Sequence, residues 1–328
     1  MSVKSEAVID VLPQDEKRAF NVIFRYAGDE WIVMDYDVAY QKVDLLLNLR
    51  IMAVDQELKK RIKEGLIETI PGFRAALTIH YDPKVLPLKK LVDELKQIES
   101  EMVQEEITAI PSRHIELPIT FRDSKTTEYI QWYAKYVRSD APNIINNHNI
   151  EYIALCNGIS VEELIDLITL TDWWTVTIGF WPGLPFLLPI DPRCMISVPK
   201  YNPTRPRTPE FAVGIGGPCV AIYPIESPGG YQLFGRTIPI FDVKQRNPAY
   251  KDNPVLLKPG DRIRFVPVPE EKLLEIIEKV YDGTYRYRII DYEYFNVARY
   301  TEFLEEVKEE AEAFRRKREE AARKAPVP

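Results

Sequence analysis

Residues 173–268 repeat one pattern, in which short runs rich in β-branched and aromatic residues are each bounded by glycine or proline. Residues 262–268 alternate apolar and polar side chains, as a half-buried edge strand does. Because glycine and proline punctuate local structure, regularly spaced runs of this kind predict short strands rather than helices. Such strands bury a core as a β-barrel or as a closed sandwich, and the pattern leaves both open.

The preceding part of the chain, residues 18–110, predicts a different architecture. Its periodicity changes from alternating to helical twice, which gives the order β-β-α-β-β-α. This order predicts a small α+β sandwich with four strands covered by two helices on one face. The strands are expected at residues 20–26, 31–35, 67–74 and 76–81, and the helices at residues 40–64 and 88–102.

The rest of the chain divides into a second domain, residues 111–270, and a tail, residues 271–328. In the second domain, Ser160 followed by Glu163 predicts a capping box at a helix start. Residues 281–300 of the tail are rich in Tyr and Arg and are expected to be irregular. Residues 300–324 predict one long charged helix with a narrow apolar stripe.

Composition excludes several classes of function. A net charge of −7 over 328 residues argues against a dedicated nucleic-acid binder, which needs a positive surface. The first ten residues lack the pattern of a signal peptide, and no apolar run reaches the roughly 18 residues of a membrane span. Three cysteines without a Cys-x-x-Cys pair and three scattered histidines predict reduced thiols and no metal. A cytoplasmic protein is therefore expected.

Residues 201–237 form the strongest candidate for a binding site. Glycine lets a ligand approach the main chain closely, and proline fixes φ, so together they predict shaped loops. These loops carry a few charges, among them Arg205, Arg207, Glu226 and Arg236. Arg205 and Arg207 lie next to prolines and are expected in an exposed loop, where contact with a partner protein is as plausible as contact with a ligand.

Motifs throughout the chain resemble one family. Residues 227–237 read Ser-Pro-Gly-Gly-Tyr-x-Leu-x-Gly-Arg-Thr, and further motifs lie at residues 70–74, 179–183, 191–193 and 213–217. They resemble the family of allophanate hydrolase subunit 1, the corresponding subunit of 5-oxoprolinase, and the KipI-type kinase inhibitors. The same unit forms half of the carboxyltransferase domain of urea carboxylase. The sequences of residues 201–205 and 208–214 are most similar to that branch, whereas residues 179–185 keep the sequence pattern of the stand-alone subunits.

The resemblance implies an α+β fold in which a ferredoxin-like α+β sandwich precedes a cyclophilin-like β-barrel and a C-terminal helix. It implies the small subunit of a carboxyltransferase-like assembly that acts on urea or a related small amide. A subunit 2 of the same family would complete a hetero-oligomer, with the active site near their junction. Biotin on a separate carrier protein, and ATP used by the assembly, are the implied cofactors. The alternatives are a subunit of 5-oxoprolinase, with ATP-dependent lactam cleavage, and a non-catalytic kinase-inhibitor-type binding protein.

Carboxyl transfer from carboxylated biotin needs groups that hold a carboxylate, groups that stabilise an oxyanion, and a base. An arginine fork pairs with a carboxylate, and backbone N–H groups of glycine-rich turns suit an oxyanion. The predicted catalytic residues are Arg236, Glu226 and Glu210, with either glutamate as the base. The predicted substrate-binding residues are Ser227, Gly229, Gly230, Gln232, Tyr201, Asn202 and Arg205. Each has a structural alternative, since Pro-Gly-Gly turns mostly shape loops and an arginine after a glycine often anchors a strand end.

Overall fold

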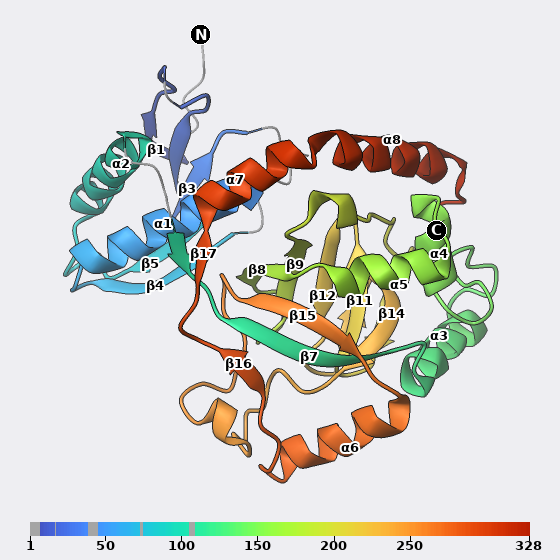
Figure 1. Ribbon diagram of the computed structural model, residues 1–328. Coiled ribbons are helices and arrows are strands. Elements are labelled where there is room, and N and C mark those ends of the chain that lie inside the picture. Colours follow the sequence, from blue (N-terminus) through green and yellow to red (C-terminus); the bar gives the residue numbers. More distant parts are fainter. Residues whose placement is uncertain (1–6, 17, 39–44, 73–74, 105–108) are drawn as a thin grey trace. The chain divides into compact units, whose positions relative to one another are not determined.

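The computed structural model describes residues 7–16, 18–38, 45–72, 75–104 and 109–328 (Figure 1). The chain divides into two compact units. The first unit comprises Met1–Pro111 and Tyr294–Thr301, and the second comprises Ser112–Glu293 and Glu302–Pro328. Each unit contains both helices and strands.

The first unit contains a five-stranded antiparallel sheet with the order β1-β2-β3-β5-β4. Helices α1 and α2 pack on one face of it, and alternate strand residues such as Phe24, Met34 and Ile79 are buried there. The short strands β6 and β17 pair with each other. The elements of this unit are β1 (Val8–Leu12), β2 (Val22–Tyr26), β3 (Trp31–Tyr36), α1 (Leu45–Arg61), β4 (Leu66–Pro71), β5 (Ala76–Tyr81), α2 (Leu88–Gln104), β6 (Ala109–Pro111) and β17 (Tyr294–Asn296).

The four predicted strands and both predicted helices of this unit are present. The predicted count of four strands is wrong, because β1 adds a fifth strand at the edge beside β2. Two stretches of these predictions, residues 40–44 of the first helix and residues 73–74 of the motif at 70–74, lie outside the described residues.

The second unit is built on a closed barrel. Seven strands of the described residues hydrogen-bond in the order β14-β11-β12-β9-β8-β15-β7, and β7 pairs with β14 to close the ring. Of the two architectures left open by the sequence, the barrel is therefore the observed one. The barrel strands are β7 (His114–Phe121), β8 (Trp173–Ile178), β9 (Pro185–Pro189), β11 (Ala212–Gly216), β12 (Cys219–Ile222), β14 (Gln232–Thr237) and β15 (Arg262–Pro267).

Strand β7 closes the barrel because its two halves have different partners. Its residues from His114 to Ile119 pair in parallel with β15, and those from Ile119 to Phe121 pair antiparallel with β14. Inside the barrel the core includes Ile115, Trp173, Val213 and Phe265, all essentially buried. Continuous burial of β11 and β14 fits strands that are covered on both faces.

Helices α3, α4, α5 and α6 lie around the barrel (Figure 1). Asp123 caps α3 by accepting a hydrogen bond from the Thr126 N–H at 3.0 Å, and the capping box predicted at Ser160 and Glu163 is confirmed at the start of α5. A two-stranded ribbon, β10 with β13, lies apart from the barrel ladder. These elements are α3 (Ser124–Tyr136), α4 (Ile150–Asn157), α5 (Val161–Leu170), β10 (Arg205–Thr208), β13 (Ser227–Gly229) and α6 (Glu270–Tyr281), with 3₁₀ turns η1 (Pro192–Cys194) and η2 (Pro248–Tyr250).

The tail differs from its prediction in two places. Residues 281–300 are not irregular throughout, since β16 (Arg288–Ile290) pairs with β7 and β17 pairs with β6. The single helix predicted over residues 300–324 is wrong, because α7 (Val297–Glu306) and α8 (Lys308–Lys324) are separate helices with Val307 between them. Within the second unit, Phe314 of α8 packs against the barrel core, so the apolar stripe docks on the chain itself.

Candidate functional site

The site-like segment folds as a hairpin-like ribbon beside the barrel. In the β10–β13 pairing, Arg205 lies opposite Gly229 and Thr208 lies opposite Ser227. The Asn202–Pro203 peptide bond is cis. The segment therefore brings together residues of two strands, β10 and β13, that are separated by β11 and β12 in the sequence.

A cavity of about 220 Å³, here called the aromatic pocket, opens beside this ribbon. Its walls come from the barrel strands β9 and β12, from the loops next to them, and from the Gly-Gly turn after β13. The Lys200 ammonium lies 5.3 Å from the centre of the Tyr231 ring and is the one formally charged group in the lining. The lining residues are Phe180, Leu184, Phe186, Lys200, Thr204, Ala221, Tyr223, Gly229, Gly230 and Tyr231.

Two glycines make room for the tyrosines of the aromatic pocket. A Cβ on Gly229 would come within 2.4 Å of the Tyr223 hydroxyl, and one on Gly216 within 2.3 Å of the Tyr231 ring. Such distances are too short for real atoms, so these rings lie where they do because both positions are glycine. Burial raises the pKa of Tyr223, which keeps its hydroxyl protonated. The glycines thus shape the pocket wall.

Arg205 is fully buried, so its predicted place in an exposed loop is wrong. Its Nη1 donates to the Tyr231 carbonyl at 2.5 Å and its Nη2 to the Thr208 hydroxyl at 3.1 Å. Its guanidinium also lies 4.4 Å from the centre of the Tyr201 ring. The side chain therefore stands behind the pocket wall. Arg207, two residues on, is exposed as expected.

Several predicted substrate-binding side chains are hydrogen-bonded within the fold. The Tyr201 hydroxyl donates to Asn149 Oδ1 at 2.8 Å, and the Gln232 amide donates to the Pro199 carbonyl at 2.8 Å. Gln232 also accepts a hydrogen bond from the Asn143 amide at 3.0 Å. Asn202 is exposed and its carbonyl accepts from Arg138. Their contact with a ligand stays a prediction.

Arg236 lies in the wall between the barrel and α3. It is 5% exposed, its Nη1 is 3.9 Å from Asp123 Oδ1, and its Nε has no hydrogen-bond partner. The Phe211 ring centre lies 6.0 Å from its guanidinium. Arg236 does not line the aromatic pocket, and its predicted catalytic role stays a prediction.

Glu210 and Glu226 line a second cavity of about 300 Å³, here called the acidic depression. Lys125 pairs with Glu210 at 3.0 Å, and Arg207 pairs with Glu226 at 2.8 Å. Because Arg207 and Tyr129 donate to Glu226, the pKa of this carboxyl is lowered. A lowered pKa weakens a general base. The lining consists of Glu210, Phe211, Pro224, Ile225, Glu226, Phe241, Asp242, Val243, Arg246 and Tyr281.

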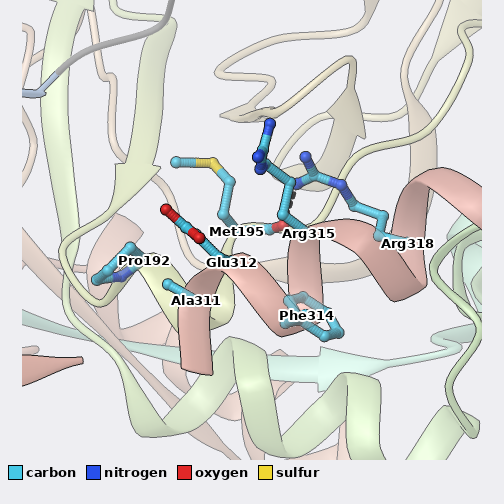
Figure 2. Close-up of a pocket in the computed structure, with 7 residues that line it drawn as sticks. All are labelled: Pro192, Met195, Ala311, Glu312, Phe314, Arg315 and Arg318. Carbon is cyan, nitrogen blue, oxygen red and sulfur yellow. Dashed lines mark hydrogen bonds between the residues drawn. The ribbon is translucent and has the colours of Figure 1, made fainter. Parts of the chain in front are cut away.

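A third cavity, of about 180 Å³, lies between η1 and α8 (Figure 2). Met195 and Phe314 contribute apolar surface, and Arg315 and Arg318 extend from the helix beside them. The Arg318 guanidinium donates to the Met195 carbonyl, which fastens α8 to the loop after η1. This cavity contains none of the residues predicted for the site.

Sequence reasoning missed Lys200, Tyr223 and Tyr231 as pocket residues. Tyr231 lies inside the motif at residues 227–237, and the signal that could have found both tyrosines is their pairing with glycines at positions 229 and 216. Among the described residues, no group of three or more His, Cys, Asp or Glu side chains is arranged to hold a metal ion. No helix in the described part of the chain is long and apolar enough to cross a membrane.

Most of the chain, including six of the seven barrel strands, is similar to one described class of domain. Residues 22–251 match the family model described as "Carboxyltransferase domain, subdomain C and D", so the chain belongs to this family.

Curated relatives and a solved structure agree with this membership. The urea amidolyase of Saccharomyces cerevisiae is 37% identical over 82% of this chain and 14% of that protein. A 5-oxoprolinase subunit of Bacillus subtilis is 32% identical over 63% of this chain and 78% of that protein. The crystal structure of the Kluyveromyces lactis urea carboxylase superposes with a TM-score of 0.82 at 31% identity, covering 98% of this chain and 29% of that one. The chain thus spans less than a third of these fungal proteins.

Proposed function

We propose that this chain is the small half of a carboxyltransferase-type site that acts on urea or a related small amide. The observation that carries the proposal is coverage. The likeness to the urea carboxylase structure extends over 98% of the chain, whereas the 5-oxoprolinase relative from Bacillus subtilis matches 63%. The additional matched residues favour the urea carboxylase branch.

The finer assignments belong to the same proposal. We infer that the barrel is of the cyclophilin-like kind and the first unit of the ferredoxin-like kind, and that residues 18–110, 111–270 and 271–328 act as first domain, barrel domain and C-terminal arm. A second subunit would supply the other wall of the site. A biotin carrier would deliver the carboxyl group, ATP would be consumed elsewhere in the assembly, and a cytoplasmic location fits these partners.

The aromatic pocket is the proposed wall of that site. Its tyrosine rings offer flat faces, and Lys200 offers a cation to a carboxylate at the same opening. A biotin ureido ring is flat and uncharged, and it carries its carboxyl group at one edge, so the residues present fit it. When bound, carboxylated biotin would supply the carboxyl group to the acceptor. Lys200, Tyr223 and Tyr231 would hold and orient these groups.

The predicted catalytic and substrate-binding residues have different proposed roles. Glu210 and Glu226 border the acidic depression and are each held by a cation, so either would act as a base only after its partner moves. Arg236 would act by keeping α3 in place through Asp123, the cap of that helix. Ser227, Gly229 and Gly230 shape the pocket side of the ribbon.

The proposal is tested on the chain together with its native partner proteins. The chain is isolated from its native source with the proteins that bind it, and transfer of the carboxyl group of labelled bicarbonate to urea is measured beside ATP-dependent cleavage of 5-oxoproline. We expect urea-dependent incorporation. Cleavage of 5-oxoproline alone would establish the alternative function of a 5-oxoprolinase subunit. Binding of a partner with neither reaction would establish a non-catalytic binding protein.

A further inference from the structure

Arg205 is a buried cation whose visible partners are all neutral. Its side chain is 0% exposed, and its hydrogen bonds go to a carbonyl and a hydroxyl. Its Nε has no hydrogen-bond partner, and neither has the Ser227 hydroxyl on the facing strand. Burial of a charge without a counter-ion is costly, because the protein interior replaces the lost hydration poorly.

The other buried arginines that the structure describes each face a carboxylate. Arg18 lies 3.0 Å from Asp15, and Arg236 lies 3.9 Å from Asp123. No described Asp or Glu forms an ion pair with Arg205. The fold therefore leaves one positive charge inside the second unit without its balancing negative charge.

This charge stands directly behind the aromatic pocket. Arg205 bonds to the carbonyl of Tyr231 and lies opposite Gly229 in the ribbon, and both of those residues line the pocket. Arg205 is also close to Tyr223. Burial raises the pKa of the Tyr223 hydroxyl, and the positive charge of Arg205 opposes this rise. The ten lining residues contain the cation Lys200 and no acid.

We propose that Arg205 is a positioning residue that makes the aromatic pocket select a small planar carboxylate. The ligand's negative charge serves as the counter-charge that no described residue supplies to Arg205, and Arg205 acts on it through the wall. It does so while holding the Tyr231 carbonyl and the Tyr201 ring in place. This inference rests on the proposed function, because it specifies the charge of the ligand at that same pocket. At an effective dielectric constant of about 20, one unit charge about 10 Å away changes an affinity by roughly tenfold or more.

The test compares two probes that differ in charge. Oxamate is a planar amide with a carboxylate, and methyl oxamate is its uncharged ester. Their dissociation constants are measured by titration calorimetry on the whole chain and on Arg205→Met and Arg205→Lys. We expect the unaltered chain to prefer oxamate by about tenfold or more. Arg205→Met should lower this preference several-fold, to the share that Lys200 supplies, while methyl oxamate binds as before, and Arg205→Lys should keep most of it.

Two further variants keep the test decisive. Arg207→Met removes the neighbouring exposed arginine and should leave the preference unchanged. Ser227→Asp places a carboxylate on the residue opposite Thr208, whose hydroxyl Arg205 binds. It should lower the preference with the arginine still present, even where Arg205→Met fails to fold. An equal loss of affinity for both probes in Arg205→Met would show that Arg205 has a structural role only. Absence of oxamate binding to the unaltered chain would also overturn the inference. Carboxylate preference without carboxyl transfer by the reconstituted assembly would contradict only the proposed function.

Discussion

The aromatic pocket and the acidic depression draw on the same segment of chain but treat charge in opposite ways. In the acidic depression, Glu210 and Glu226 each have a cation of the chain within 3.0 Å. In the aromatic pocket, Lys200 lines the opening and Arg205 lies behind it, and no acid lines the cavity. The depression is thus balanced by its own residues, whereas the pocket has excess positive charge.

This difference indicates which cavity is prepared for a ligand. Charges that are already paired contribute little to binding, because a ligand must first displace a partner. A cavity with unbalanced positive charge binds an anion without first breaking an ion pair. This contrast supports the proposal that the aromatic pocket binds the ligand, and we expect the depression to contribute through local structure.

The largest effect is expected from Gly229→Ala. The new Cβ would lie 2.4 Å from the Tyr223 hydroxyl, so the ring must leave its place in the pocket wall. We expect a loss of stability of about 1–3 kcal/mol and loss of oxamate binding. Gly179→Ala is the matched control, since a Cβ there would have no atom within 4 Å and Gly179 does not line the pocket. Thermal unfolding and calorimetry measure both, and equal behaviour of the two variants would show that Tyr223 does not define the pocket.

A smaller effect is expected from Lys200→Gln. Removal of the one cation in the lining should weaken oxamate binding about tenfold, because a charge-assisted contact is replaced by a neutral one. The unfolding temperature should not change. Lys244→Gln, at an exposed position beside the depression, is the control. Unchanged oxamate affinity in Lys200→Gln would mean that the carboxylate lies elsewhere.

A still smaller effect on turnover is expected from Glu226→Gln in the reconstituted assembly. The carboxylate is held by Arg207 and Tyr129, and its pKa is lowered, so we expect less than about a threefold change in rate. Comparison of kcat and KM with those of the unaltered chain measures this. A fall in kcat of about a hundredfold would establish Glu226 as the base and reverse the assignment of the two cavities.

The architecture was more predictable from the sequence than the site. Alternation of apolar and polar residues and Gly/Pro boundaries predict the barrel strands because both signals lie within the strand's own sequence. Strand β1 was missed because its pairing with β2, rather than a strong local pattern, makes it a strand. The helix break at Val307 was missed because no glycine or proline lies near it in the sequence.

The burial of Arg205 could not be read from its neighbours in the sequence. Prolines and charges around it predict exposure, and only the pairing of β10 with β13 places it inside. The tyrosine–glycine contacts of the pocket arise in the same way, between strands. Site geometry in this chain depends on contacts across the fold, which a local pattern does not contain.

The smallest expected effect is the pH dependence of the Arg207–Glu226 pair. Since the folded pKa of Glu226 is lowered, the pair stabilises the fold above the unfolded pKa of about 4.3 and loses this contribution as pH falls through the folded pKa. The unfolding temperature of Glu226→Gln should therefore be below that of the unaltered chain at about pH 7, and the difference should vanish well below about pH 4. A difference that persists in acid would contradict the pairing.

The closure of the barrel by β7 has a consequence for the time course of folding. Thr237 of β14 donates to the Pro118 carbonyl of β7 across 119 positions of sequence, and the β15 partners of β7 are farther still. Joining segments so distant costs chain entropy before any contact repays it, which slows folding. During synthesis β7 would emerge long before its partners. We expect the ring to close last, after β8, β9, β11 and β12 have paired with their nearer neighbours.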